Sequence, residues 1–238
     1  MAILRDTSLC AIIRDEIMNP AGGIKDFVDS TLPFVERAII VDTGSKDGTR
    51  EYLEQAKGEY PHLEVRDHPF DGYGPSRNVS IERVSTNWIL ILDADERIRQ
   101  KDFSVLERER ETHHLGHLEF AFLEVQGMEI SRKVKGQLTN RFFHRDLNTK
   151  FMELVLEYAS LGYNPERDFA TFSKVLIYHF VPLEEAKKKK EEEWYGKGLL
   201  NPCGMYMWGK EHIPKSAPSE CPSFPEWKAL NPFRERYR

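Results

Sequence analysis

The most constraining feature of this sequence is an alternation, over roughly its first 100 residues, between short apolar runs and longer segments with apolar residues at helical spacing. The apolar runs, which we expect to be β-strands, are residues 9–13, 38–41, 63–66 and 88–92. The helical segments between them are residues 22–34, 49–57 and 76–84. Strands without polar alternation are typical of a parallel sheet that helices cover on both faces. The pattern therefore predicts an α/β fold.

The second half of the chain differs, because its strand candidates follow one another with few helices between them. These candidates are residues 118–125, 140–143, 154–158 and 175–180. We therefore expect a mixed, mainly parallel sheet flanked by helices. A charge run at residues 187–193 is typical of a solvated helix. Six of the 13 prolines lie between residues 202 and 232, so the Pro-rich C-terminal tail is not expected to form a core of its own.

The composition excludes several classes of protein. The net charge of −5 and a pI near 6.0 lack the basic excess of a general nucleic-acid binder. The three cysteines are widely spaced and form no C-x-x-C pair, which argues against a disulfide framework or a zinc site. No apolar run is long enough for a signal peptide or a transmembrane helix. We therefore expect a cytoplasmic protein without a transmembrane segment, and peripheral membrane contact stays open.

The triplet Asp93-Ala94-Asp95 directly follows the apolar run at residues 88–92. In open α/β sheets, ligands bind at the carboxyl ends of the strands, so both carboxylates are expected in one site. A hard divalent cation, Mg²⁺ or Mn²⁺, suits such oxygens and would bridge to diphosphate oxygens. The alternative is an acidic turn that caps the next helix. By composition a D-x-D triplet arises about once in a chain of this length. The evidence for a binding site is therefore the position of the triplet directly after a predicted strand.

A second carboxylate, Asp42, ends the run at residues 38–41 and precedes a turn that contains Gly44 and Gly48. An ordinary strand–turn–helix junction would explain the glycines, which permit tight backbone turns. It does not explain a carboxylate at a buried strand end. Because the carboxyl ends of parallel strands meet at one edge, Asp42 and Asp93 should face the same crevice.

Four segments occur in order along the chain, residues 8–16, 40–49, 76–78 and 88–96, and together they resemble family 2 glycosyltransferases with the GT-A fold. The similarity is specific over about residues 8–100 and continues weakly to about residue 180. It implies a single GT-A domain at residues 1–198, with a nucleotide-binding half (1–100) and an acceptor half (101–198). Residues 199–238 would form the Pro-rich tail.

The resemblance also implies a nucleotide-sugar site that consists of Arg14, Glu16, Asp42, Arg77 and Asp93. Asp42 would accept a hydrogen bond from the base, while Arg14 and Glu16 would line the base and ribose. The planar guanidinium of Arg77 would approach the base or the diphosphate. Asp93 would contact the ribose or the metal. Arg14 and Asp15 stand where many relatives have Lys and Asn, which leaves the base preference open.

The remaining implied roles concern the metal and the acceptor. Asp95, with Asp93, would ligate Mn²⁺ or Mg²⁺, and His179 resembles the histidine that completes the metal site in many relatives. A satisfied core histidine is the alternative for His179. Glu157 is the candidate general base, although Leu156 precedes it where relatives have His, and Glu153 is the second candidate. An exposed strand carboxylate is the alternative for Glu157.

The expected function is metal-dependent transfer of a sugar, with inversion, from a nucleoside-diphosphate sugar to an acceptor hydroxyl. UDP is the favoured nucleotide, and the acceptor is expected to be a glycan or glycoconjugate. One alternative is a non-catalytic nucleotide-sugar-binding protein with a degraded site, which Leu156 favours. A sugar nucleotidyltransferase would need a Gly-rich basic phosphate loop near the first strand, where this chain has Arg14-Asp15-Glu16. A dehalogenase-type phosphatase would carry its D-x-D after the first strand, not the fourth.

Overall fold

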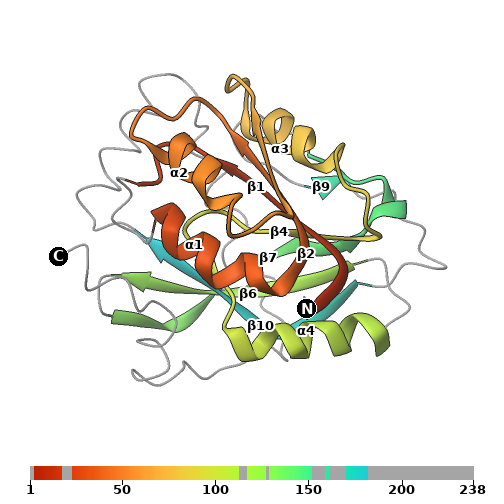
Figure 1. Cartoon of the computed structure of the whole chain (residues 1–238). Coiled ribbons are helices and arrows are strands. Elements are labelled where there is room, and N and C mark those ends of the chain that lie inside the picture. Colours follow the sequence, from red (N-terminus) through yellow and green to blue (C-terminus); the bar gives the residue numbers. More distant parts are fainter. Residues whose placement is uncertain are drawn as a thin grey trace.

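The computed structural model describes residues 3–17, 23–112, 117–126, 129–151, 159–160 and 170–181. In this part of the chain the main sheet has eight strands in the order β3-β2-β1-β4-β7-β6-β10-β5 (Figure 1). These strands are β1 (Leu4–Ile13), β2 (Val35–Asp42), β3 (Leu63–Asp67), β4 (Trp88–Ile91), β5 (Glu96–Arg97), β6 (His117–Gln126), β7 (Glu129–His144) and β10 (Ala170–Val181). Two short strands, β8 (Lys150–Phe151) and β9 (Ala159–Ser160), form a separate antiparallel pair.

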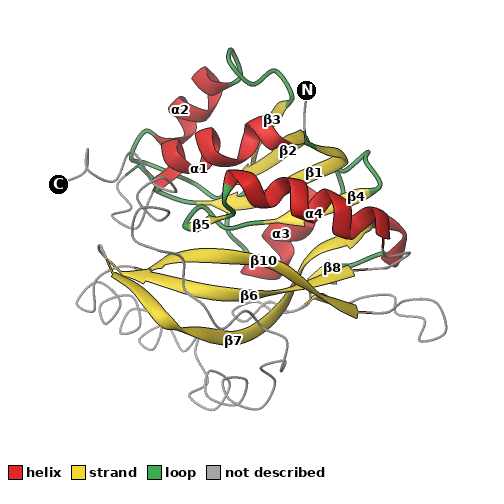
Figure 2. Cartoon of the chain, turned by 90° about the horizontal axis from the view of Figure 1, so that it is seen from below, coloured by secondary structure: helices red, strands yellow, loops and turns green. Residues whose placement is uncertain are grey.

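The sheet is mixed and mainly parallel, as the sequence predicts. Strand β1 pairs in parallel with both β2 and β4, and β2 pairs in parallel with β3. Strand β7 runs antiparallel between β4 and β6, whereas β10 is parallel to β6 and antiparallel to β5. In Figure 2 the long strands β6, β7 and β10 lie together on one side of the molecule, and helices α1 and α2 lie on the other.

The described helices are α1 (Gly23–Thr31), α2 (Thr49–Ala56), α3 (Tyr73–Ile81) and α4 (Gln100–Thr112), with 3-10 turns η1 (Leu32–Phe34) and η2 (Arg145–Leu147). In α1 and α2 apolar residues recur at helical spacing and are buried along one stripe, whereas the buried residues of α3 are Gly74, Ser76, Arg77 and Ser80. None of the described helices is long and apolar enough to cross a membrane.

Among the described residues, two apolar clusters cover the two faces of the sheet, because successive strand residues point to opposite faces. Leu9, Ala11 and Ile13 of β1 face a cluster that includes Phe27 of α1 and Phe103 of α4. The alternate residue, Cys10, faces a second cluster of strand and loop residues, against which Ile81 of α3 packs; its buried members are Ile39, Val84, Ile89, Ile91, Phe143, Leu147 and Phe151. Burial on both faces explains why the strand sequences lack polar alternation.

Several elements differ in extent from the sequence-based expectation. Helix α4 was not expected, because its charged sequence contains only two buried apolar residues, Phe103 and Leu106. Strand β7 is much longer than the predicted 140–143, and β10 begins before residue 175. The predicted strand at 154–158, the charge-run helix and the tail lie outside the described residues.

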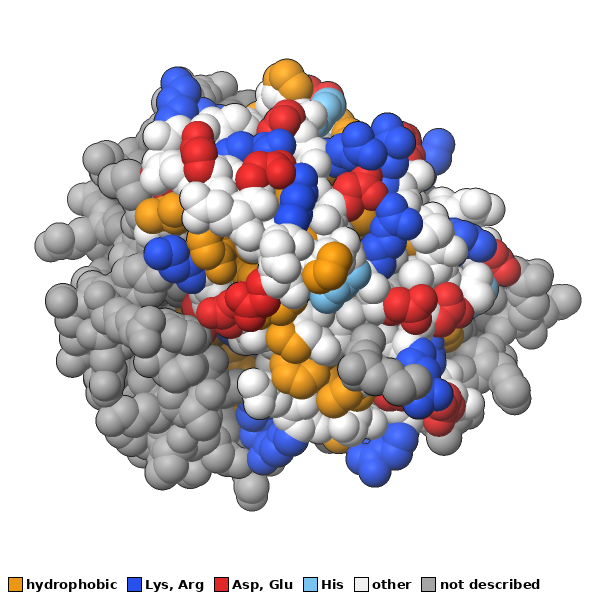
Figure 3. Space-filling model, in the orientation of Figure 1, with side chains coloured by type: hydrophobic (Ala, Val, Ile, Leu, Met, Phe, Trp, Pro, Cys, Tyr) orange, Lys and Arg blue, Asp and Glu red, His pale blue; other side chains and the backbone are white. Residues whose placement is uncertain are grey.

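The surface of the described part is largely polar. Figure 3 shows acidic and basic side chains interspersed on the face toward the viewer, with small hydrophobic areas between them. Among the large hydrophobic side chains of the described residues, Phe70 is the exposed one, at 41%. The apolar residues of the described part therefore lie mainly in the core.

Candidate functional site

The candidate site lies at the edge of the sheet where the parallel strands β1, β2 and β4 end. Their carboxyl ends lead into residues 14–17, 43–48 and 93–95. The register pairs Ile13 with Asp42, so the first two of these loops start side by side. This is the edge where open α/β sheets bind ligands.

Asp42 is the last residue of β2, and its side chain is almost completely buried. Its Oδ1 atom accepts hydrogen bonds from the backbone N–H groups of Gly44 (2.9 Å) and Ser45 (2.8 Å). Gly44 has a φ of 106°, a backbone conformation that glycine adopts readily. The other oxygen, Oδ2, is buried and has no hydrogen-bond partner within the described part of the chain. Because an unsatisfied buried carboxylate oxygen is costly, the atom is suited to an N–H donor from a ligand.

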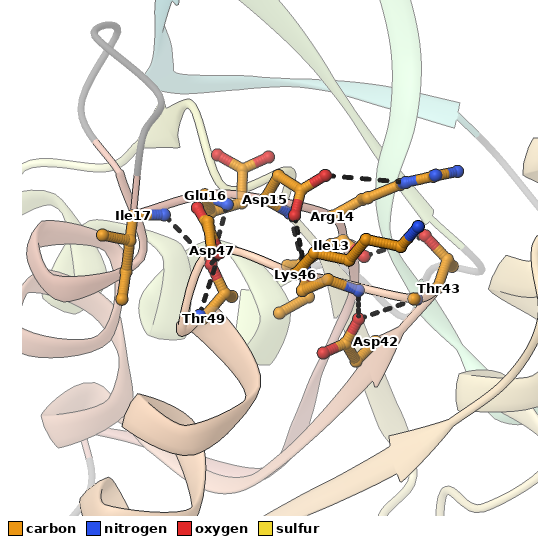
Figure 4. A network of polar contacts seen from close by, with 12 residues as sticks. Ile13, Arg14, Asp15, Glu16, Ile17, Asp42, Thr43, Lys46, Asp47 and Thr49 are labelled. Carbon is orange, nitrogen blue, oxygen red and sulfur yellow. Dashed lines mark hydrogen bonds and ion pairs between the residues drawn. The ribbon is translucent and has the colours of Figure 1, made fainter.

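The loops after β1 and β2 are joined by a polar network, shown in Figure 4. The Asp15 carboxylate accepts from the backbone N–H of Lys46 at 2.6 Å. The Thr49 hydroxyl oxygen accepts from the N–H groups of Glu16 (2.8 Å) and Ile17 (3.0 Å). Asp15 has a φ of 55°, which the short polar side chain tolerates better than most. The two loops therefore form one platform beside Asp42.

Arg14 and Glu16, the predicted base and ribose residues, both lie on this platform (Figure 4). The Arg14 side chain is 53% exposed, and its Nε atom lies 3.7 Å from Asp15 Oδ2. At that distance and exposure the ion pair contributes little to stability. Within the described part of the chain, Arg14 is therefore only weakly restrained and is accessible to a ligand on the platform.

Asp93 follows β4 and faces two guanidinium groups. Arg77 Nη2 donates to Oδ1 at 2.7 Å, and Arg141 Nη2 donates to Oδ2 at 3.2 Å. Arg77 is 1% exposed. Partial burial opposes ionisation of Asp93, but the charges of Arg77 and Arg141 outweigh it and hold its pKa well below the usual range. Asp93 is thus a carboxylate whose two oxygens are both engaged by arginine.

Glu96 and Arg141 complete this cluster, and the sequence analysis assigned no role to either. Arg141 Nη2 also donates to Glu96 Oε1 at 2.8 Å, and Glu96 Oε2 accepts from the backbone N–H of Asp93 at 2.9 Å. Burial raises the pKa of Glu96 to about 7, although the charge of Arg141 acts in the opposite direction. Glu96 adjoins the D-x-D triplet in sequence, whereas nothing in the sequence of β7 distinguishes Arg141.

Asp95 and His179 are brought together by the pairing of β5 with β10. His179 is the register partner of Glu96, and the Phe180 N–H donates to the carbonyl of Asp95 at 2.7 Å. His179 Nε2 then lies 3.5 Å from Asp95 Oδ2. Burial lowers the pKa of His179, but the contact with Asp95 and the nearby carboxylates outweigh it and raise the pKa to about 9.

An oxygen and an imidazole nitrogen that converge in this way suit Mn²⁺ or Mg²⁺, of which Mn²⁺ accepts imidazole more readily. No group of three or more His, Cys, Asp or Glu side chains among the described residues could enclose a metal ion. A cation held by Asp95 and His179 would therefore need further oxygens from a ligand or water. Magnesium-like ions are commonly held in this way by one or two side chains and substrate phosphates.

Arg97 is a further residue that the sequence analysis missed. Its guanidinium is fully buried and donates to the carbonyls of Ala94 and Glu96, both at 2.7 Å. It also donates to Asp26 Oδ2 (3.1 Å) and to the carbonyl of Gly23 (3.1 Å) in the first turn of α1. The carbonyls on both sides of Asp95 are therefore held by one side chain, which restrains the turn that carries Asp95.

The predicted general base Glu157 and its alternative Glu153 lie outside the described residues. Their proposed roles rest on the sequence resemblance alone. The structure thus brings together Asp42 with the Arg14–Glu16 loop, and Asp93, Asp95, Arg77 and His179 around the turn after β4.

Comparison with known proteins identifies relatives of this chain. A sequence model described as glycosyl transferase family 2 matches residues 19–179. A TPR repeat-containing protein of Synechococcus elongatus is 33% identical over 100 residues, which cover 41% of this chain and 22% of that protein. The dolichyl-phosphate beta-glucosyltransferase ALG5A of Trichomonas vaginalis is 32% identical over 96 residues, which cover 40% of this chain and 29% of that protein. The matched segments therefore cover less than a third of the length of either relative.

Solved structures share the fold. The mannosyltransferase PcManGT from Pyrobaculum calidifontis, in complex with GDP-Man and Mn²⁺, superposes with a TM-score of 0.55 at 13% identity, over 98% of this chain and 72% of that chain. TarS 1–349 of S. aureus, in complex with UDP-GlcNAc, gives a TM-score of 0.52 at 14% identity, over 74% of this chain and 58% of that chain. At such identities the likeness shows the fold, a GT-A glycosyltransferase fold.

Proposed function

The chain belongs to glycosyl transferase family 2, and we propose that it transfers a sugar from a UDP-sugar to a hydroxyl of a glycan or glycoconjugate. The proposal includes a requirement for Mn²⁺ or Mg²⁺, inversion at the anomeric carbon, and a cytoplasmic location. The catalytic domain is proposed to be residues 1–198, with 199–238 as a tail outside it. The family match and the geometry at the carboxyl ends of β2 and β4 support this reading.

The observation that carries the proposal is Asp42 Oδ2, a buried oxygen that has no hydrogen-bond partner within the described residues. Oδ1 already accepts two backbone hydrogen bonds, so only Oδ2 can accept one from a base. Uracil presents one ring N–H, at N3, between two carbonyl groups. Guanine presents two adjacent donors, at N1 and N2, which pair best with both oxygens of a carboxylate. A carboxylate with one oxygen free therefore favours a uracil nucleotide over a guanine nucleotide.

The diphosphate is proposed to lie toward the turn after β4. There Asp95 and His179 would hold the cation, and the cation, when bound, offsets the negative charge that grows on the leaving diphosphate. Arg77 and Arg141 keep Asp93 ionised through their charges, and Asp93 is oriented by both of them. Preformed charges of this kind need no rearrangement when the sugar–phosphate bond breaks.

Glu157 is proposed to remove the proton from the acceptor hydroxyl, with Glu153 as the second candidate. Inversion by single displacement requires a base on the face opposite the leaving group, and a carboxylate suits that task. Leu156 stands where relatives have His, and this departure favours the second reading, a protein that binds a nucleotide sugar without transferring it. Release of UDP from a UDP-sugar in the presence of acceptor or water separates the two readings.

The proposal is tested by isothermal titration of the protein with UDP, CDP and GDP in the presence of Mn²⁺. We expect UDP to bind most tightly, because cytosine lacks the N3–H and guanine needs a second acceptor. A screen of UDP-sugars for UDP release then identifies the donor. Equal affinity for the three nucleotides would contradict the role of Asp42, and an absence of nucleotide binding would contradict the whole proposal.

A further inference from the structure

The residue after Arg77 on α3 makes an unusual contact with the short strand β8. The Asn78 Nδ2 group donates to the carbonyl of Phe151 at 3.0 Å, and the Phe151 N–H donates to Asn78 Oδ1 at 2.9 Å. The N–H and C=O of one strand residue point to the same side of the strand. The carboxamide of Asn78 therefore makes the two hydrogen bonds to Phe151 that the backbone of a neighbouring strand would make. Phe151 is buried, and this pair of bonds satisfies both of its backbone polar groups.

The ring of Phe151 in turn supports Arg77. The Arg77 guanidinium carbon lies 5.4 Å from the centroid of the Phe151 ring, within the range of a cation–π contact. The same guanidinium donates to Asp93 at 2.7 Å and is almost fully buried. The Phe151 ring, whose backbone Asn78 holds, is therefore one of the contacts that restrain Arg77 beside Asp93.

We propose that Asn78 is a positioning residue for the diphosphate side of the donor site, acting through Phe151 on Arg77 and Asp93. The inference rests on the proposed function, which places the donor phosphates at the turn after β4. Asn78 itself is half-buried and touches neither the base platform nor the Asp95–His179 pair in the described contacts. Its loss should weaken the contribution of the diphosphate to binding and leave the contribution of the nucleoside unchanged.

The test compares two probes, UDP and uridine, each titrated into the full chain with Mn²⁺. Because both probes contain the same nucleoside, the ratio of UDP affinity to uridine affinity measures the contribution of the diphosphate to binding. In Asn78→Ala we expect this ratio to fall by roughly tenfold, the size of effect expected when one hydrogen bond to a charged group is impaired. Asn78→Asp should be at least as affected, because its carboxylate cannot donate to the Phe151 carbonyl. The matched control is Asn87→Ala, which removes a hydrogen bond to Asp6 at the opposite end of β4.

A double-variant cycle distinguishes positioning from a general loss of stability. Phe151→Leu keeps the two hydrogen bonds between the backbone of residue 151 and Asn78 but removes the aromatic ring. This variant should by itself lower the ratio of UDP affinity to uridine affinity. If Asn78 acts through that ring, Asn78→Ala should add little to Phe151→Leu, whereas independent effects would multiply. Melting temperatures identify the variants that are folded under the assay conditions, and only these enter the cycle.

The outcomes separate the inference from the function on which it rests. A wild-type protein that binds neither UDP nor uridine contradicts the proposed function and the role of Asn78 within it. A wild-type preference for UDP that Asn78→Ala and Asn78→Asp both retain overturns the inference alone. Multiplying effects in the cycle would also overturn it, because the path through Phe151 would then be wrong.

Discussion

His179 Nε2 lies 3.5 Å from Asp95 Oδ2, although the two residues come from distant parts of the chain. The contact exists because β5, which begins one residue after Asp95, pairs with β10 in a register that sets His179 opposite Glu96. A hydrogen bond from Phe180 N–H to the Asp95 carbonyl ties the two segments together. Main-chain pairing of β5 with β10 therefore brings the predicted metal ligands Asp95 and His179 together.

The first prediction concerns this pair. Asp95→Asn and His179→Gln should each lower the affinity for Mn²⁺ by about tenfold or more, because each removes one of the two side-chain ligands proposed. Isothermal titration of Mn²⁺ in the presence of UDP measures the effect. His144→Gln is the matched control, since His144 caps η2 through a hydrogen bond from Asp146 N–H. Wild-type Mn²⁺ affinity in both site variants would show that the cation binds elsewhere.

The second prediction concerns the base. In Asp42→Asn the side-chain carbonyl can still accept from Gly44 and Ser45, and the amide NH₂ group then replaces Oδ2. An NH₂ group donates to N3 of cytosine but opposes the N3–H of uracil. We expect the wild type to prefer UDP over CDP by roughly tenfold or more. The variant should show the reverse preference, for CDP over UDP.

Competitive titration of UDP and CDP measures this reversal. The matched control is Asp67→Asn, because Asp67 is the register partner of Asp42 on β3 but is exposed and pairs with Arg50. That control should keep the preference for UDP. An Asp42→Asn variant with unchanged selectivity would show that Asp42 does not read the base.

The third prediction concerns the proposed general base. Glu157→Gln keeps the size and hydrogen-bonding capacity of the side chain but removes its basicity, so turnover should fall by about 10²-fold or more. UDP-sugar affinity should hardly change, because the lost interaction belongs to the transition state. Steady-state kinetics and titration give the two quantities. Glu153→Gln is the control and should have a mild effect; the reverse pattern would exchange the two roles.

The fourth prediction concerns Cys10, which lies inside the sheet on β1. Burial raises the pKa of its thiol from 9.0 to about 12, so almost no thiolate exists in the folded protein at pH 8. Iodoacetamide should therefore leave Cys10 unmodified in the native state and alkylate it in urea, as read by mass spectrometry of the Cys10 peptide. Rapid native alkylation would mean that β1 opens readily.

The same shift predicts the direction of a pH effect on stability. The thiol of the unfolded chain ionises as the pH passes 9, while the folded protein keeps it protonated to about pH 12. The contribution of Cys10 to stability is therefore complete below pH 9 and is lost as the pH rises from 9 toward 12. Cys10→Ala should show a smaller loss of melting temperature over that range than the wild type.

The sequence by itself determined the alternation of strands and helices in the first half, and with it the positions of Asp42 and Asp93 at strand ends. These features depend on hydrophobic periodicity within a few neighbouring residues, which is a local property of the chain. The same periodicity did not reveal α4, because two buried apolar positions in a charged segment give too narrow an apolar stripe. It also did not separate the functions of Asp93 and Asp95, which are two residues apart in one turn.

Only the tertiary structure decided which partners those carboxylates have. Arg141 reaches Asp93 and Glu96 because β7 pairs with β4, and Arg97 holds the turn around Asp95 because α1 packs beneath it. Asn78 and Phe151 meet because α3 packs on β8. Each contact depends on the register between segments far apart in the chain, and register follows from the simultaneous packing of all strands. Local periodicity determines which residues of a strand face the core, but it does not identify the strand that lies beside it.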